Sequence, residues 1–211
     1  MSTLCERDPD LSIVIPAYNL EECITPMLES LKAQDMDGYA VEIIFVLNNC
    51  TDDTEGVIRR NGLDCQLINC EIQGCGPARN AGLDIARGEY IWTIDGDDWL
   101  MSDTAVRQIL DRVKRDGMNI LRVPFSHERY RYNYFSMVWQ YVIRREFIGD
   151  IRFPNYQPAE DDAFMEAVLR KAGYDRYTYA YLPHLSEELY YYNYLRPGSN
   201  MYRHQVLGEK I

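Results

Sequence analysis

Three carboxylates follow a short apolar run near the middle of the sequence. The run spans Tyr90 to Ile94, and the carboxylates are those of Asp95, Asp97 and Asp98. Carboxylates this close together repel one another unless a cation or hydrogen-bond donors neutralise them. Hard oxygen ligands suit Mg²⁺ or Mn²⁺, which commonly join a few protein carboxylates to the phosphates of a substrate. The alternative is an acidic turn in which Asp98 caps a helix.

A second acidic group opens a helical pattern later in the chain. Glu160, Asp161 and Asp162 precede the amphipathic run from Ala163 to Ala172. Acids at a helix start are usually caps and partners of the helix dipole. One of them could instead be a general base, which requires that it lie within hydrogen-bond reach of a reacting hydroxyl.

A glycine-rich segment leads into a third helical pattern. Gly74-Cys75-Gly76-Pro77 precedes Arg79 and Asn80. Backbone N–H groups at such a helix start can bind phosphate. The GxGxxG pattern of dinucleotide-binding enzymes is absent, because Arg79 stands at the position of the last glycine.

Short β-rich runs alternate with helical patterns in the first half of the chain. The expected strands are Leu11 to Ile15, Val41 to Leu47, Leu63 to Cys70 and Tyr90 to Ile94. The expected helices lie near Leu20 to Gln34, Asp52 to Asn61 and Cys75 to Arg87. This alternation predicts a largely parallel α/β sheet, which binds ligands beyond the carboxyl ends of its strands. The segments 16–19, 48–52 and 95–99 should therefore converge on one crevice.

The second half is less regular and rich in tyrosine. It opens with a helix near Asp103 to Arg115 and a strand near Asn119 to Pro124. The alternation of Tyr190, Tyr192 and Tyr194 fits a half-buried strand, and tyrosines equally suit a sugar-binding groove. We favour packing for most of them. No linker or repeat interrupts residues 1–211, so we expect one domain with a first half at 1–100 and a second at 101–211.

Composition limits the classes of function. With 46% hydrophobic residues the chain can build a core, and its net charge of −11 argues against nucleic acid as a partner. The six cysteines form no CxxC pair and no apolar, basic leader precedes them, so we expect reduced thiols in a cytoplasmic protein. No apolar stretch approaches the roughly 20 residues of a membrane-spanning helix.

Taken together and in order, these segments resemble the family 2 glycosyltransferases of the GT-A fold. The matching segments are Ser12 to Asn19, Thr51 to Thr54, Gly76 to Gly82, Gly88 to Ile91 and Asp95 to Trp99, with a looser likeness at Glu160 to Asp162 and Tyr194 to Ser199. The resemblance implies a Rossmann-like, mostly parallel central sheet flanked by helices, with the donor side in the first half and an acceptor side in the second. It also implies an enzyme that transfers a sugar from a nucleoside diphosphate sugar.

The resemblance assigns the nucleoside to residues after the first two strands. Tyr18 would stack on the nucleobase, while Pro16 and Ala17 line the pocket of base and ribose. One departure concerns the base: the family commonly has Asp-Asp-Gly-Ser where this chain has Leu47 to Cys50, so Asn48 replaces an acid. Its amide can pair with uracil, and guanine shows a similar pattern. UDP is favoured and GDP stays open.

The resemblance places the chemistry on the acidic groups. Arg79 would lie on the nucleotide side of the cleft. Asp95 and Asp97 match the family's DxD pair: Asp95 would contact the ribose or the metal, and Asp97 would bind the Mn²⁺ or Mg²⁺ that bridges the phosphates. Asp161 matches the catalytic base, with inversion at the anomeric carbon. Asp98 receives no role.

Partners and alternatives follow from the same likeness. The acceptor would be a saccharide or a lipid-linked sugar in surface polysaccharide or glycolipid synthesis. The likeness also allows a location at the inner face of the membrane and a homo-oligomer. Asn48 and the short C-terminal part also suit a noncatalytic nucleotide-sugar-binding or regulatory partner. A nucleotidyltransferase would need a basic, glycine-rich loop that Pro16 to Asn19 does not provide. His204 could approach the metal, although a surface position is the simpler interpretation.

Overall fold

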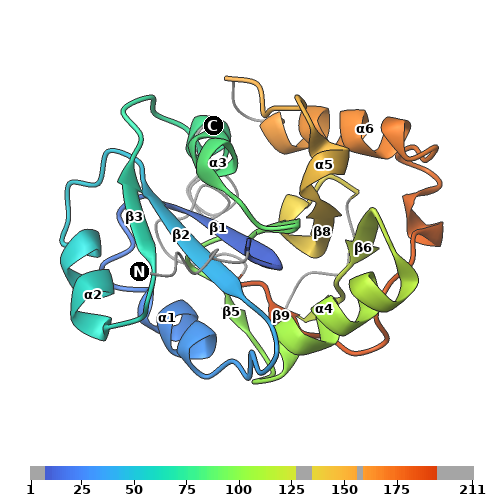
Figure 1. Ribbon diagram of the computed structural model, residues 1–211. Helices are drawn as coiled ribbons and strands as arrows, with labels where there is room; N and C mark the ends of the chain where they lie inside the picture. Colours follow the sequence, from blue (N-terminus) through green and yellow to red (C-terminus); the bar gives the residue numbers. More distant parts are fainter. Residues whose placement is uncertain (1–7, 127–134, 156–158, 194–211) are drawn as a thin grey trace, which may run out of the picture.

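The protein is an α/β structure built on one six-stranded sheet (Figure 1). The computed structural model describes residues 8–126, 135–155 and 159–193. The strands lie in the order β3-β2-β1-β4-β8-β6. Their bounds are β1 Leu11–Ala17, β2 Val41–Leu47, β3 Gln66–Asn69, β4 Tyr90–Thr93, β6 Ile120–Arg122 and β8 Tyr141–Arg144. Strands β1 to β4 are parallel, and β8 runs antiparallel to both neighbours, which confirms the mostly parallel sheet.

Helices cover both faces of this sheet (Figure 1). Their bounds are α1 Thr25–Lys32, α2 Thr54–Asn61, α3 Cys75–Ile85, α4 Ala105–Asp116, α5 Arg145–Ile148 and α6 Glu160–Lys171, with 3₁₀ turns η1 Val138–Gln140 and η2 Tyr179–Tyr181. Buried side chains of α1, α2 and α4 join one core cluster, and those of α3, α5 and α6 join the other. The sheet is therefore the middle layer of three.

The alternation of side chains along the strands explains why both faces are covered. Ile13 and Ile15 point into the core beneath α1 and α4, whereas Val14 between them points into the core beneath α3 and α6. Strands that are apolar on both faces are typical of parallel sheets enclosed by helices.

A small second sheet pairs the last described strand with two strands from the middle of the chain. It has the order β5-β9-β7, with β5 at Trp99–Leu100, β7 at Phe125–Ser126 and β9 at Tyr190–Tyr191. The Trp99 and Tyr191 rings stack at 4.1 Å between centroids. The predicted strand through Tyr190 is thus present for two residues, and Tyr194 lies outside the described residues.

Several element boundaries differ from the sequence prediction by a few residues, and two of these differences have an identifiable reason. Strand β1 continues through Pro16 and Ala17, which were expected to follow it. Pairing of β4 with β1 ends at Val14, so the missing N–H of Pro16 falls beyond β4 and costs no ladder hydrogen bond. Helix α1 begins at Thr25 rather than Leu20, with Pro26 in its first turn, where a proline is tolerated.

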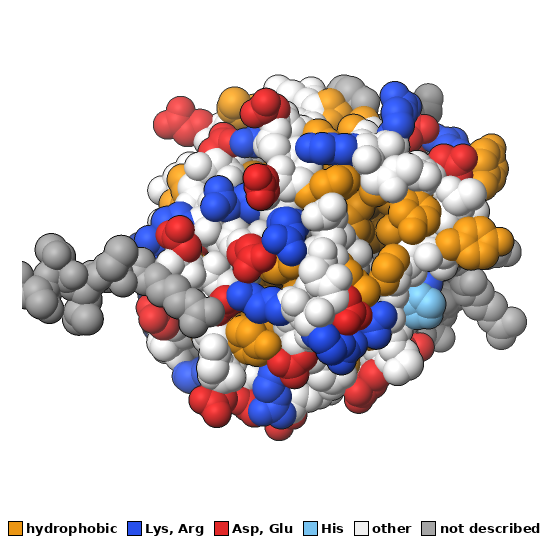
Figure 2. Space-filling model, turned by 45° about the vertical axis from the view of Figure 1, so that its right-hand side comes forward, with side chains coloured by type: hydrophobic (Ala, Val, Ile, Leu, Met, Phe, Trp, Pro, Cys, Tyr) orange, Lys and Arg blue, Asp and Glu red, His pale blue; other side chains and the backbone are white. Residues whose placement is uncertain are grey.

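The surface carries both signs of charge. On the face in Figure 2, Lys and Arg side chains are interspersed with Asp and Glu and form no continuous basic band. In the described part of the chain, no helix is both long and apolar enough to cross a membrane.

Candidate active site

The strand order places two of the predicted loops side by side. The chain moves from β1 outward through β2 to β3, and then returns to place β4 on the other side of β1. The carboxyl ends of β1 and β4 form the point where the strand order reverses, which is where open α/β sheets bind their ligands. Tyr18 follows β1 and Asp95 follows β4 closely. A methyl group on Gly96 would lie 3.4 Å from the Pro16 carbonyl oxygen, so the loops after these two strands are neighbours.

A buried arginine joins the two acidic groups of the sequence. The Arg79 side chain, on α3, is 3% exposed. Its Nη1 donates to Oδ1 of Asp161 at 2.5 Å, and its Nη2 donates to Oδ1 of Asp95 at 2.8 Å. Asp95 and Asp161 are 29% and 27% exposed, so each carboxylate has one side on the protein and one on the solvent. The predicted base and the first acid of the DxD pair thus belong to one site.

Close packing of α3 against the start of α6 makes this contact possible. A methyl group on Gly76 would lie 2.8 Å from the Pro154 carbonyl oxygen and 3.2 Å from Phe153 Cβ, so only glycine fits there. Asn80 fixes the same approach, since its Nδ2 donates to the Phe153 carbonyl and its Oδ1 accepts from the Phe153 N–H. The glycine and asparagine of this segment therefore bring Arg79 to α6.

The electrostatic surroundings of Asp161 favour its neutral form more than usual. Burial raises the pKa of Asp161 to about 7. The negative charges of Asp95, Glu160 and Asp162 act in the same direction, and the nearby Arg79 opposes them. A carboxyl group with a pKa near neutrality is well matched to taking a proton from a hydroxyl.

The three acids after β4 have different surroundings. Asp95 and Asp97 are partly exposed, whereas Asp98 is 1% exposed. Burial raises the pKa of Asp98 well above its ordinary value, and the charges of Asp97 and Asp95 add to that effect. Its carboxylate accepts hydrogen bonds from the Tyr190 hydroxyl and the Asn193 N–H. Asp98 therefore faces the protein interior, which separates it from the other two.

The acidic loop fits a cation that is shared with a substrate. Among the described residues, no three His, Cys, Asp or Glu side chains gather into a metal-binding group. Mg²⁺ and Mn²⁺ commonly use one or two carboxylates and complete their shell with phosphate oxygens and water. Asp97, with Asp95 beside Arg79, matches that pattern. The role of these two acids as metal ligands stays a prediction.

The loop after β1 exposes an aromatic ring. Tyr18 is 49% exposed, so its ring is accessible to a ligand from the solvent. The Asn19 side chain accepts from Thr51 N–H at 2.8 Å, which ties the loop after β1 to the loop after β2. Ala17 is buried and Pro16 is partly exposed at the end of β1. Stacking of Tyr18 on a base is compatible with this arrangement and stays a prediction.

The Asn48 side chain forms hydrogen bonds with the backbone that follows β3. Its side chain is 4% exposed, and its Nδ2 donates to the carbonyls of Cys70 and Ile72 at 3.1 and 2.7 Å. Its Oδ1 accepts from Gly74 N–H at 2.8 Å. Both amide hydrogens are thus engaged, and only the second lone pair of Oδ1 is left for a nucleobase.

Several residues outside the predicted set support the site. Tyr190 and Asn193 contact the acidic loop, and Phe153 lies 5.4 Å from the Arg79 guanidinium. The only signal in the sequence for Tyr190 is its place in the alternating tyrosines. Nδ1 of His184 donates to the Leu182 carbonyl at 3.2 Å, and His204 lies outside the described residues.

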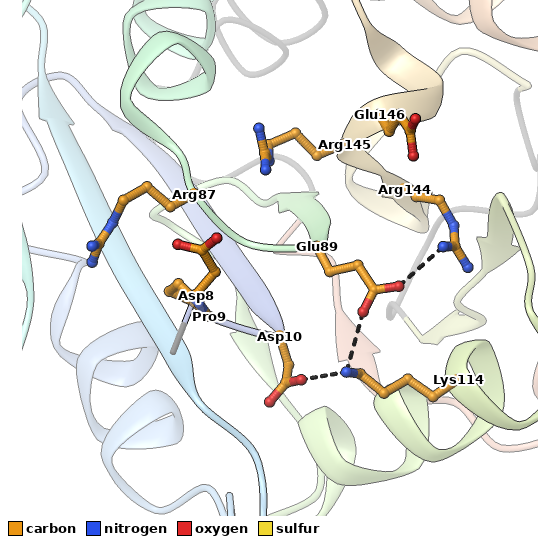
Figure 3. Close-up of a pocket in the computed structure, with 9 residues that line it drawn as sticks. All are labelled: Asp8, Pro9, Asp10, Arg87, Glu89, Lys114, Arg144, Arg145 and Glu146. Carbon is orange, nitrogen blue, oxygen red and sulfur yellow. Dashed lines mark hydrogen bonds and ion pairs between the residues drawn. The ribbon is translucent and has the colours of Figure 1, made fainter. Parts of the chain in front are cut away.

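A separate hollow of about 370 Å³ lies at the opposite end of the sheet (Figure 3). It is lined by Asp8, Pro9, Asp10, Arg87, Glu89, Lys114, Arg144, Arg145 and Glu146. Lys114 pairs with Asp10 and Glu89, and Arg144 pairs with Glu89 (Figure 3). These ion pairs join the starts of β1 and β4 to α4 and β8. The hollow is therefore remote from the strand ends that carry the site.

Known proteins share both the sequence pattern and the fold. The model described as glycosyl transferase family 2 matches residues 12–177. TarS of Staphylococcus aureus, a poly(ribitol-phosphate) beta-N-acetylglucosaminyltransferase, is 28% identical over 90% of this chain and 36% of its own length. EpsJ of Bacillus subtilis, an uncharacterized glycosyltransferase, is 28% identical over 75% of this chain and 57% of its own.

Solved structures of similar fold contain nucleotide sugars. TarS 1–349 in complex with UDP-GlcNAc superposes with a TM-score of 0.76 at 23% identity, covering 92% of this chain and 60% of that one. The mannosyltransferase PcManGT from Pyrobaculum calidifontis, in complex with GDP-Man and Mn²⁺, gives 0.71 at 17% identity over 94% and 61%. The chain spans little more than half of EpsJ and about a third of TarS. Its sequence and its GT-A fold show that this chain belongs to glycosyl transferase family 2.

Proposed function

We propose that the protein is an inverting, metal-dependent glycosyltransferase that uses a nucleoside diphosphate sugar, with UDP as the favoured nucleotide. The acceptor is a hydroxyl of a saccharide or of a lipid-linked sugar, in the synthesis of a surface polysaccharide or glycolipid. The observation that carries the proposal is the contact of buried Arg79 with both Asp161 and Asp95. It joins a candidate base to the loop that receives the donor.

The side chains suggest how the transfer proceeds. Oδ1 of Asp161 accepts from Arg79, so Oδ2 is the oxygen that takes the proton of the acceptor hydroxyl as it attacks the anomeric carbon. Attack from the side opposite the leaving nucleotide inverts that carbon. Arg79 holds the base and Asp95 at fixed positions, which lowers the entropic cost of bringing two substrates together. A divalent cation at Asp97 would stabilise the charge on the departing diphosphate.

The choice of nucleotide and of acceptor in this proposal depends on what the similar proteins bind. TarS was solved with UDP and with UDP-GlcNAc, while PcManGT was solved with GDP-Man. WfaP of Escherichia coli, described as a UDP-Glc:alpha-D-GlcNAc-diphosphoundecaprenol beta-1,3-glucosyltransferase, is 33% identical over 57% of this chain and 45% of its own. These descriptions support a UDP-sugar and a cell-surface acceptor.

The direct test is the metal dependence of nucleotide binding. We expect UDP to bind wild type more tightly with Mn²⁺ than with EDTA, and Asp97→Ala to remove that difference by deleting a cation ligand. Isothermal titration calorimetry measures both affinities, and GDP is titrated alongside. Asp84→Ala, at a carboxylate that is 61% exposed and pairs with Arg152, should behave as wild type. Equal affinity of wild type with and without Mn²⁺ contradicts the proposal.

A second prediction concerns the dependence of the reaction on pH. The pKa of Asp161 is raised to about 7, and only the ionised carboxylate can take a proton. We therefore expect kcat/KM to be constant above pH 8 and to fall about tenfold per pH unit well below pH 7, because this ratio reports on the free enzyme. The measurement is transfer rate at low donor concentration from pH 5 to 9. A profile that is flat down to pH 5 contradicts Asp161 as the base.

A further inference from the structure

The last described strand contacts the acidic loop at several points. Tyr190, at the start of β9, is fully buried, and its hydroxyl donates to Oδ2 of Asp98. The same hydroxyl oxygen accepts from the N–H of Asp95 at 3.2 Å. One phenolic group thus joins the first and the last acid of the loop.

Asn193 adds two more contacts from the same segment. Its N–H donates to Oδ1 of Asp98 at 2.8 Å, and its Nδ2 donates to the carbonyl oxygen of Asp97 at 3.1 Å. Together Tyr190 and Asn193 contact Asp95, Asp97 and Asp98. The contacts to Asp95 and Asp97 involve only backbone atoms of these two acids, so Tyr190 and Asn193 act on the path of the loop.

The position of Tyr190 is itself fixed by packing. Its ring stacks on Trp139 at 4.9 Å and lies 6.1 Å from the Trp92 ring at a tilt of 55°. The ladder of β9 with β5 pairs Tyr190 with Leu100, directly after the acidic loop. A hydroxyl held this firmly can restrain a loop, since binding groups need placement to within about 0.5 Å.

We propose that Tyr190 and Asn193 are positioning residues, which set the backbone of residues 95–98 so that the Asp95 and Asp97 carboxylates face the diphosphate of the donor. Asp98 is the buried anchor through which both act. The proposal rests on the function proposed above. It gives the third acid of the loop a task and makes the donor site depend on a strand about ninety residues later in the chain.

The test variant is Tyr190→Phe, which removes only the hydroxyl and keeps the stacked ring. Tyr141→Phe is the matched control, because Tyr141 is also buried and its hydroxyl donates to the Phe135 carbonyl at 2.8 Å, away from the acidic loop. Hydrogen exchange of the amides of residues 95–98 follows the loop directly. Calorimetry with UDP, in Mn²⁺ and in EDTA, follows the site.

We expect exchange of the Asp95 amide to be at least about tenfold faster in Tyr190→Phe, because this amide loses the hydroxyl oxygen that accepts its hydrogen bond. The Kd for UDP in Mn²⁺ should rise about tenfold for the same reason, and the Kd in EDTA should not change. Tyr141→Phe should leave all three quantities as in wild type. Asn193→Ala, which removes the contact to Asp97, should also weaken binding in Mn²⁺ only.

The outcomes separate this proposal from the one on which it rests. Wild type that binds UDP no better in Mn²⁺ than in EDTA overturns the proposed function, and the positioning role with it. Wild type that shows the metal effect beside a Tyr190→Phe variant with the same Kd overturns only the positioning role. The positioning role is also overturned if Tyr190→Phe weakens UDP binding equally in Mn²⁺ and in EDTA. Equal exchange rates of the Asp95 amide in Tyr190→Phe and Tyr141→Phe overturn it as well.

Discussion

Asp161→Asn should lower kcat by about a hundredfold to ten thousandfold, the usual contribution of a general base. An amide of the same shape keeps a hydrogen bond with Arg79 through its oxygen but cannot take a proton from the acceptor. The Kd for UDP in Mn²⁺ should stay close to that of wild type, because Asp161 contacts Arg79 rather than the nucleoside loops. The measurements are steady-state transfer, or slow donor hydrolysis where no acceptor is supplied.

The neighbouring acid provides the control for this prediction. Asp162→Asn also replaces a carboxylate by an amide, one residue further along α6. Because the structure gives Arg79 an ion pair with Asp161, we expect Asp162→Asn to retain most of the activity. Wild type that binds UDP and turns over no donor favours the noncatalytic binding partner instead. Asp161→Asn with the kcat of wild type removes Asp161 from the reaction.

The sheet and its loops could be predicted because buried parallel strands have a distinctive sequence pattern. The run Val41–Leu47 is apolar at every position except Glu42 and has the predicted bounds. Loops at the carboxyl ends of such strands converge by geometry alone, so the order of the motifs was enough to predict that the loop after β4 lies beside the end of β1 at Pro16. The ends of elements were less accurate, as with Pro16 and helix α1, because they depend on where a neighbour stops pairing.

The contacts inside the site depend on how closely distant segments of the chain pack together, which the local sequence does not encode. Arg79 and Asp161 are 82 positions apart, and their contact requires the close passage of α3 at Gly76. Asp98 received no role from the sequence, and it is buried against Tyr190, 92 positions later. Residue types indicated chemistry here, but packing decided which of the three carboxylates is buried.

The departure from the family after β2 illustrates the same point. Asn49 occupies the position of the usual glycine and has a φ of 56°, a left-handed conformation that asparagine tolerates better than most residues. Asn48 uses its two amide hydrogens on the carbonyls of Cys70 and Ile72. A carboxylate there could donate to neither carbonyl, so these two hydrogen bonds require the amide.

Arg79→Met should destabilise the protein by about 3–5 kcal/mol, the usual cost of removing one partner from a buried ion pair. Methionine fills a similar volume but leaves the carboxylates of Asp95 and Asp161 without their cation. Chemical denaturation measures the free energy of unfolding. Arg79→Lys should recover only part of the loss, because a single ammonium group cannot reproduce the forked contact with two carboxylates.

An exposed ion pair provides the matched comparison for this variant. Arg152 pairs with Asp84 at 3.0 Å with side chains 38% and 61% exposed, and Arg152→Met should cost about 1 kcal/mol or less. The double variant Arg79→Met/Asp161→Asn should be more stable than the sum of the two single losses, since it also removes one of the uncompensated charges. A strictly additive double variant, or an Arg79→Met protein as stable as Arg152→Met, would show that Arg79 does not hold the two acids together.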